Sequence, residues 1–108
     1  MNKKMLQEKL NFVIFGENEW RLYQATIRSD GTPSITLDVH WLTKNEAKRL
    51  IMNVINVLHN TVNLEVIHGY NHGTAIKEML ADENFDGRLT ERYCPEYNPG
   101  ITKMRIAA

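Results

Sequence analysis

Strict alternation of apolar and polar residues over "ITLDVHW", residues 35–41, is the feature that most limits the fold of this chain. In an extended segment every second side chain lies on the same face, so the pattern predicts a strand with one buried and one exposed face. Asp38 and His40 share the exposed face, two positions apart. Trp41 closes the apolar series and is predicted to be its last inward residue.

A helix is predicted directly after this strand. In "LTKNEA", Thr43 stands three residues ahead of Glu46, an arrangement in which each side chain accepts from a backbone N–H that the first helical turn leaves free. Asn60 suits the end of this helix. The apolar residues recur at the spacing of one helical face, and they are Ala47, Leu50, Ile51, Val54, Ile55 and Leu58. This stripe is predicted to be core.

A second strand and helix follow. The stretch "VNLEVIH", residues 62–68, predicts a strand, and residues 74–83 predict a helix with an apolar side. A crossover through a helix to a parallel neighbour is right-handed in nearly all folds, so both strands should end at the same edge of the sheet. We therefore expect His40 to lie near His68, at the edge where open α/β sheets bind ligands.

The rest of the chain after residue 83 predicts two further strands. These are "RLTERYC" and "ITKMRI", joined through "PEYNPG", where two prolines and a glycine favour a reversal. The element order is then βαβαββ. The predicted fold is an α/β protein of the α+β sandwich type, in which two helices pack on a four-stranded mixed sheet.

The turn-forming stretch "SDGTPS", residues 29–34, separates an N-terminal leader, residues 1–34, from a domain over residues 35–108. In the leader, "NFVIF" and "WRLYQATI" flank "GENE", which fits a β-hairpin. A short helix near residues 4–10 is the alternative. Either element could extend the sheet, pack on the core or mediate self-association.

Composition limits the function classes. Thirteen Lys and Arg balance thirteen Asp and Glu, so the field of the whole molecule does not attract phosphate, and a nucleic-acid role needs a local patch. Cys94 is the sole cysteine, which rules out an intrachain disulfide, gives a thiolate zinc site little support and favours a small buried thiol. Neither a signal peptide nor a membrane-spanning run is present, which predicts a cytoplasmic protein without a membrane partner.

The glycine-rich stretch "HGYNHG", residues 68–73, joins the second strand to the second helix. Gly69 and Gly73 would let the backbone approach a ligand, and free N–H groups at the helix start would favour an anion such as phosphate. Lys77 could add a positive charge, while His68 and His72 could donate protons or hydrogen bonds. The alternative is a tight connection that needs glycine for geometry alone.

Four basic residues of the last two strands could form another surface. Arg88 and Arg92 share one side of their strand, and Lys103 and Arg105 share one side of theirs. If these sides coincide, the open face of the sheet presents four cations to phosphate, with Glu91 pointing away from Arg88 and Arg92. The alternative is that the charges are solvated and blunt a sheet edge.

With these motifs, the chain resembles the Smr (small MutS-related) domain family over about residues 35–107. "LDVHW" is similar to the family's Leu-Asp-Leu-His-Gly at the end of the first strand, "HGYNHG" to its glycine-rich turn, and "NPGIT" to the region before its last strand. Trp41 departs from the family by replacing a glycine, and it could cover the crevice or stack a base instead of pointing inward. Asn71 replaces the second glycine of the turn and tolerates the same left-handed backbone.

The resemblance implies the fold of the C-terminal domain of bacterial translation initiation factor three, DNA or RNA as partner, and ribosome engagement in some members. Other members of the family are endonucleases that nick DNA or cleave RNA, so the resemblance also implies endonuclease activity as a candidate function of this chain. The residues that would contact nucleic acid are His68, Gly69, Asn71, His72, Gly73, Lys77, Arg88, Arg92, Lys103 and Arg105.

The catalytic residues would be Asp38 and His40. The carboxylate could orient the imidazole as an acid or base, or the two side chains could together hold Mg²⁺ or Mn²⁺. In the structural alternative, Asp38 caps a loop and His40 hydrogen-bonds the crevice wall. The alternative function is a non-catalytic module recruited to RNA, ribosomes or a protein. Sequence indicates no further metal ligands and no oligomeric state.

Overall fold

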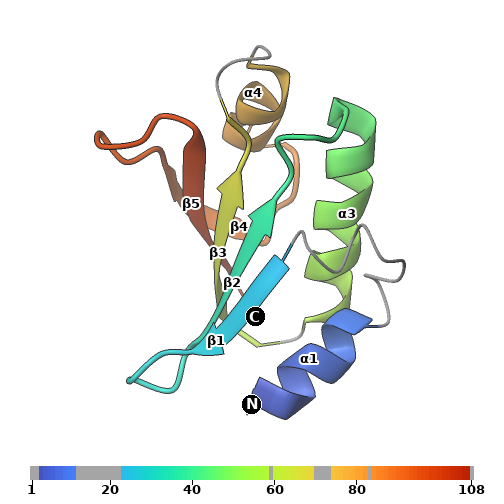
Figure 1. Cartoon of the computed structure of the whole chain (residues 1–108), viewed down its shortest axis with the longest axis vertical. Coiled ribbons are helices and arrows are strands. Elements are labelled where there is room, and N and C mark those ends of the chain that lie inside the picture. Colours follow the sequence, from blue (N-terminus) through green and yellow to red (C-terminus); the bar gives the residue numbers. More distant parts are fainter. Residues whose placement is uncertain (1–2, 12–22, 59, 70–73, 83, 108) are drawn as a thin grey trace.

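The computed structural model describes residues 3–11, 23–58, 60–69, 74–82 and 84–107 (Figure 1). Three helices and five strands are formed by these residues. In chain order they are α1 (Lys3–Asn11), β1 (Tyr23–Ile27), β2 (Pro33–Asp38), α3 (Lys44–Val57), β3 (Val62–Ile67), α4 (Ala75–Ala81), β4 (Leu89–Tyr93) and β5 (Ile101–Ile106).

The five strands form one mixed sheet in the order β1-β2-β3-β5-β4. β2 and β3 are parallel, and the other neighbouring strands are antiparallel. The α+β class and the mixed sheet are confirmed, but the predicted numbers of four strands and two helices are wrong. The difference arises in the leader, because the additional helix α1 and the additional strand β1 both lie before residue 34. β1 joins the sheet by pairing with β2.

The leader forms part of the same core as the rest of the chain. Leu6 and Leu10 of α1 are fully buried, and β1 extends the sheet as an edge strand. α1 corresponds to the helix alternative for residues 4–10. Most of the first arm of the predicted hairpin, together with its turn, lies outside the described residues, and β1 belongs to its second arm.

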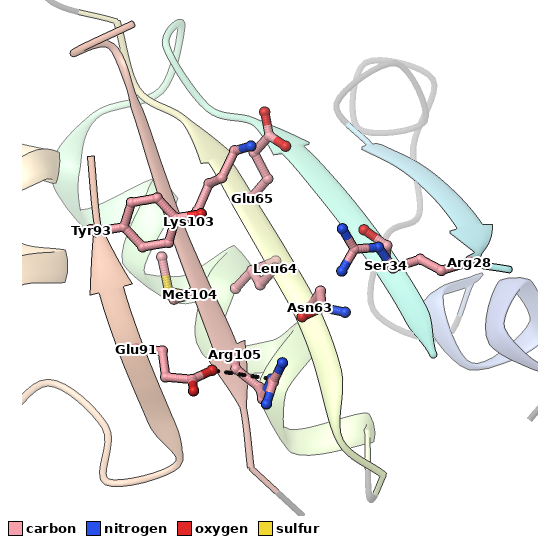
Figure 2. Close-up of a pocket in the computed structure, with 10 residues that line it drawn as sticks. All are labelled: Arg28, Ser34, Asn63, Leu64, Glu65, Glu91, Tyr93, Lys103, Met104 and Arg105. Carbon is pink, nitrogen blue, oxygen red and sulfur yellow. Dashed lines mark ion pairs between the residues drawn. The ribbon is translucent and has the colours of Figure 1, made fainter. Parts of the chain in front are cut away.

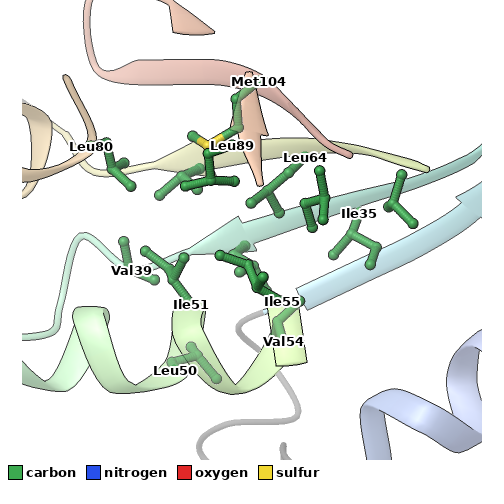
Figure 3. Packing of buried hydrophobic residues seen from close by; sticks show 14 of the residues in the cluster. Ile35, Val39, Leu50, Ile51, Val54, Ile55, Leu64, Leu80, Leu89 and Met104 are labelled. Carbon is green, nitrogen blue, oxygen red and sulfur yellow. The ribbon is translucent and has the colours of Figure 1, made fainter. Parts of the chain in front are cut away.

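The core lies between one face of the sheet and α3. Figure 3 shows Ile51 and Ile55 of α3 facing Ile35 and Leu64 of the two parallel strands. The predicted helical stripe is confirmed, since all six of its apolar residues are buried. The described helices lie on the same side of the sheet in Figure 1, which leaves the other face open. None of them is long and apolar enough to span a bilayer.

The predicted start of α3 is confirmed. The Glu46 backbone N–H donates to Thr43 Oγ1 over 3.2 Å, and the Thr43 N–H donates to Glu46 Oε1 over 3.0 Å. β2 ends earlier than predicted, at Asp38, and a turn closes where the Leu42 N–H donates to the Val39 carbonyl. This turn carries Trp41 off the sheet before Thr43 caps α3. The prediction that Trp41 points inward is therefore wrong, and its side chain is 75% exposed.

Candidate functional site

The carboxyl ends of β2 and β3 bring His40 and His68 together, as predicted. Asp38 pairs in register with Ile67, and both histidines line one cavity of about 150 Å³. Gly69, which follows His68, has a φ of +71°, a conformation that glycine adopts without strain. The parallel pairing therefore positions the first histidine motif against the start of the glycine turn.

Asp38 and His40 form a side-chain pair. The Nδ1 of His40 is hydrogen-bonded to Asp38 Oδ1, and the His40 backbone N–H also donates to that oxygen over 3.3 Å. An ionised carboxylate can only accept, so the proton of the neutral imidazole resides on Nδ1 and Nε2 carries a lone pair. The side chains of His40 and Asp38 are 30% and 35% exposed, so the pair is partly accessible to a ligand. The ring of Trp41 lies against that of His40, with 4.1 Å between centroids.

His68 is buried and uses both of its ring nitrogens within the fold. Nδ1 donates to the Gly69 carbonyl over 3.0 Å, which leaves Nε2 to accept from the Thr102 hydroxyl over 2.8 Å. Burial lowers the pKa of His68, and the positive charge of Lys77 lowers it further against the opposing hydrogen bond to Gly69. His68 is thus a neutral residue that ties the end of β3 to β5.

The cavity beside these histidines is positively lined. It lies at the start of α3 and next to α4, and its lining residues are His40, Leu42, Thr43, Lys44, His68, Ala75, Ile76 and Lys77. In the described part of the chain, two lysines and no carboxylate belong to this lining. In a chain with no net charge, this arrangement provides the local patch that phosphate binding requires.

The remaining residues of the predicted turn are only partly described. Asn71, His72 and Gly73 lie outside the described residues. Lys77 lines the cavity, as expected of a residue one turn into α4. Lys44 was not singled out from the sequence, although its position directly after the helix cap at the end of a strand could have indicated it.

The donor set of the described residues does not fit a divalent metal ion. In that part of the chain, no three His, Cys, Asp or Glu side chains gather closely enough to hold one. The Asp38 carboxylate, which the Mg²⁺ or Mn²⁺ interpretation needs, is already engaged by His40. No step is therefore assigned to a metal.

The four cations of the last two strands do not share one face, so the condition on which a four-cation surface depended is not met. Lys103 and Arg105 lie on the open face, where Arg105 pairs with Glu91 over 3.3 Å (Figure 2). Side-chain hydrogen bonding with Tyr97, and then the charges of neighbours including Glu65, raise the pKa of Lys103. Lys103 and Arg105 thus have anionic or aromatic neighbours on the open face.

Arg88 and Arg92 face the helix layer instead. A bulge between Thr90 and Tyr93, with Glu91 at a φ of +53°, shifts the alternation so that Arg92 turns away from the open face. Arg92 donates to the Asp86 carbonyl over 3.0 Å. Arg88 precedes β4, and its guanidinium donates to carbonyls near the end of α3 and at the C-terminus, which belong to Ile55, Leu58 and Ala107.

Known proteins add no assignment to this geometry. Comparisons with family models, with curated proteins and with solved structures found no match for this chain. The side chains at the carboxyl ends of β2 and β3 are therefore the basis for inferring a function.

Proposed function

We propose that this chain is a nucleic-acid-binding protein of the Smr type that cleaves phosphodiester bonds at Asp38 and His40. The observation that carries the proposal is the hydrogen-bonded pair of Asp38 and His40 beside a cavity lined by Lys44 and Lys77. Phosphodiester cleavage needs a group that moves a proton and positive charge near the phosphoryl oxygens. Both are present at this edge of the sheet.

In the proposed reaction, Asp38 orients the imidazole of His40 and stabilises its protonated form. His40 Nε2 takes a proton from the attacking hydroxyl or water, or, when protonated, gives one to the leaving oxygen. Lys44 and Lys77 offset the negative charge that develops on the phosphoryl oxygens. Each role uses a side chain that lies in or beside the same cavity.

The arrangement of the strands supports the same proposal. From β2 to β5 the elements follow the order βαβαββ, which the resemblance to the C-terminal domain of translation initiation factor three implies. Helix α1 and strand β1 add to that unit at its N-terminal side. We propose that residues 35–107 form the Smr-type fold and that the leader is an addition to it.

The test is a cleavage and binding assay on labelled single-stranded RNA, structured RNA and supercoiled DNA, with and without Mg²⁺ or Mn²⁺. Asp38→Asn and His40→Gln should each lower cleavage about a hundredfold or more while the circular dichroism spectrum stays unchanged. Asp30→Asn is the matched control, because Asp30 is an exposed turn carboxylate away from the cavity. Cleavage that persists in both folded variants would contradict the assignment.

A second candidate is a non-catalytic nucleic-acid-binding module, which the exposed ring of Trp41 beside the cavity favours. Its prediction is binding without cleavage, and binding that survives Asp38→Asn and His40→Gln. Lys77→Ala and added salt should weaken that binding, because phosphate contacts release counterions.

A further inference from the structure

We propose that the nucleic acid bound by this site is single-stranded and lies along a groove from Trp41 and His40, past Lys77, to Arg92. We call this surface the α4 groove. The inference rests on the proposed function, since it names the substrate class of the same site. It adds Trp41 as a residue that contacts the ligand and places Arg92 on the same surface as Lys77.

The α4 groove consists of two adjoining cavities. The first, described above, is lined by His40, Lys44 and Lys77 among others. The second has a volume of about 210 Å³, and its lining residues are Lys77, Ala81, Arg92, Tyr93, Cys94 and Thr102. Lys77 lines both cavities. His68 lines the first cavity and Thr102 lines the second, and the Thr102 hydroxyl donates a hydrogen bond to His68. A ligand can therefore extend along both sides of Lys77.

Charge complementarity favours a polyanion in the α4 groove. Lys44, Lys77 and Arg92 line it, and none of the described Asp or Glu residues belongs to either lining. The carboxylates closest in the chain to the first cavity are engaged. Asp38 pairs with His40, Glu46 caps the first turn of α3, and Glu78 accepts from the Thr74 hydroxyl. In a chain with equal numbers of acidic and basic residues, this local excess of cations suits a phosphodiester backbone.

Arg92 adds an independent observation. One of its terminal nitrogens donates to the Asp86 carbonyl, whereas its Nε is buried without a hydrogen-bond partner among the described residues. A buried donor without a partner is unfavourable. Because Nε itself is buried, Arg92 acts on a ligand through its positive charge at the lining of the second cavity, and phosphate is an anion of matching charge.

An exposed aromatic side chain at one end of the α4 groove selects single strands over duplexes. Trp41 is 75% exposed next to His40. Tyr93 borders the second cavity, but it pairs with Lys103 across β4 and β5, and its ring lies on the open face of the sheet (Figure 2). In a duplex both faces of a base are covered by its stacked neighbours, so only an unpaired base can stack on the Trp41 ring. A cationic groove with an aromatic stacking platform is the usual construction of single-strand binding sites.

The first test measures binding by fluorescence anisotropy with one labelled oligonucleotide, as RNA and as DNA, alone and annealed to its complement. Single strands should bind about tenfold tighter than the duplex. Trp41→Ala should weaken single-strand binding about tenfold, whereas Trp41→Phe should retain most of it. Tyr97→Ala is the matched control, because Tyr97 is 76% exposed and lines neither cavity.

The second test measures the salt dependence of single-strand binding. Lys44→Ala and Lys77→Ala should each reduce the slope of log K against log salt by about 0.7, as expected for one lost phosphate contact. Lys48→Ala is the control, because Lys48 lies one turn further along α3, is exposed and lines neither cavity. Melting curves for every variant exclude loss of folding as the cause.

The outcomes separate this inference from the proposed function. Equal or tighter binding of the duplex, or unchanged binding by Trp41→Ala, would overturn the single-strand groove while leaving a nucleic-acid role in place. Binding to none of the oligonucleotides would overturn both. Single-strand preference that is lost in Trp41→Ala and kept in Tyr97→Ala would support the groove whether or not cleavage is seen.

Discussion

Gly69 lies directly against His40: a Cβ added to Gly69 would stand 3.3 Å from the Cβ of His40. Gly69 also has a φ of +71°, and its N–H and that of His68 both donate to the Gly100 carbonyl. The glycine is thus required twice, by its backbone conformation and by the closeness of the neighbouring strand end. This contact couples the glycine turn to the position of the Asp38 and His40 pair.

Gly69→Ala should destabilise the protein by about 2 kcal/mol, because a non-glycine residue in a left-handed conformation is strained and the added methyl group crowds His40. Two matched variants separate these effects. Gly31→Ala should cost about 1 kcal/mol, since Gly31 has a φ of +86° but nothing within 4 Å of the added atom. Gly87→Ala, with neither restriction, should change the free energy of unfolding by less than about 0.5 kcal/mol. The free energies of unfolding would be measured with urea, and equal values for the three variants would contradict this account.

Arg88→Ala should destabilise the protein by about 3 kcal/mol. The guanidinium of Arg88 donates to the carbonyls of Ile55 and Ala107 over 2.7 and 2.8 Å, and also to that of Leu58. Removing it takes a donor from both carbonyls at the end of α3, although the Ile55 carbonyl still accepts from the Leu58 N–H. Arg105→Ala is the control and should cost less than about 1 kcal/mol, because its pair with Glu91 is exposed. A similar loss of stability in both variants would refute the capping role.

The pH dependence of stability should include a contribution from His68. Burial holds the pKa of His68 below its unfolded value of about 6.5, so below that pH the unfolded chain binds more protons than the folded one. The contribution of His68 to stability is present above about pH 6.5 and is lost as the pH falls toward its folded pKa. Chemical unfolding of wild type and His68→Gln between pH 5 and 8, roughly the histidine range, measures it. The variant should lose less stability on acidification, and parallel curves for the two proteins would show that the His68 proton is not involved.

Leu10→Ala should destabilise the whole domain by about 3 kcal/mol, since Leu10 of α1 is fully buried in the common core. Thermal unfolding should remain a single cooperative transition with a lower midpoint. Lys4→Ala, at an exposed position of the same helix, should leave the midpoint nearly unchanged. An unchanged midpoint for Leu10→Ala would mean that α1 contributes nothing to the cooperative core.

Local patterns in the sequence predicted much of the central structure. The alternation in β2, the capping pair of Thr43 and Glu46 and the apolar stripe of α3 were readable because each depends on residues close together in the chain. The meeting of His40 and His68 was also predictable, because parallel strands joined by a helix must end at the same edge. The addition of α1 and β1 to this unit was left open, since either of two local structures suited the leader.

What the sequence determined by itself is therefore the strand and helix units from β2 to α4 and the edge at which their polar residues gather. Only the tertiary structure decided the directions of Trp41, Arg88 and Arg92. Trp41 turns outward because the chain must leave β2 to begin α3, and Arg92 changes face because of the bulge beside Glu91. Arg88 turns to carbonyls that lie about 30 residues away in sequence, beyond the reach of any local pattern. Strand periodicity indicates which side chains share a face only while the register is unbroken, and partners distant in the chain decide where it breaks.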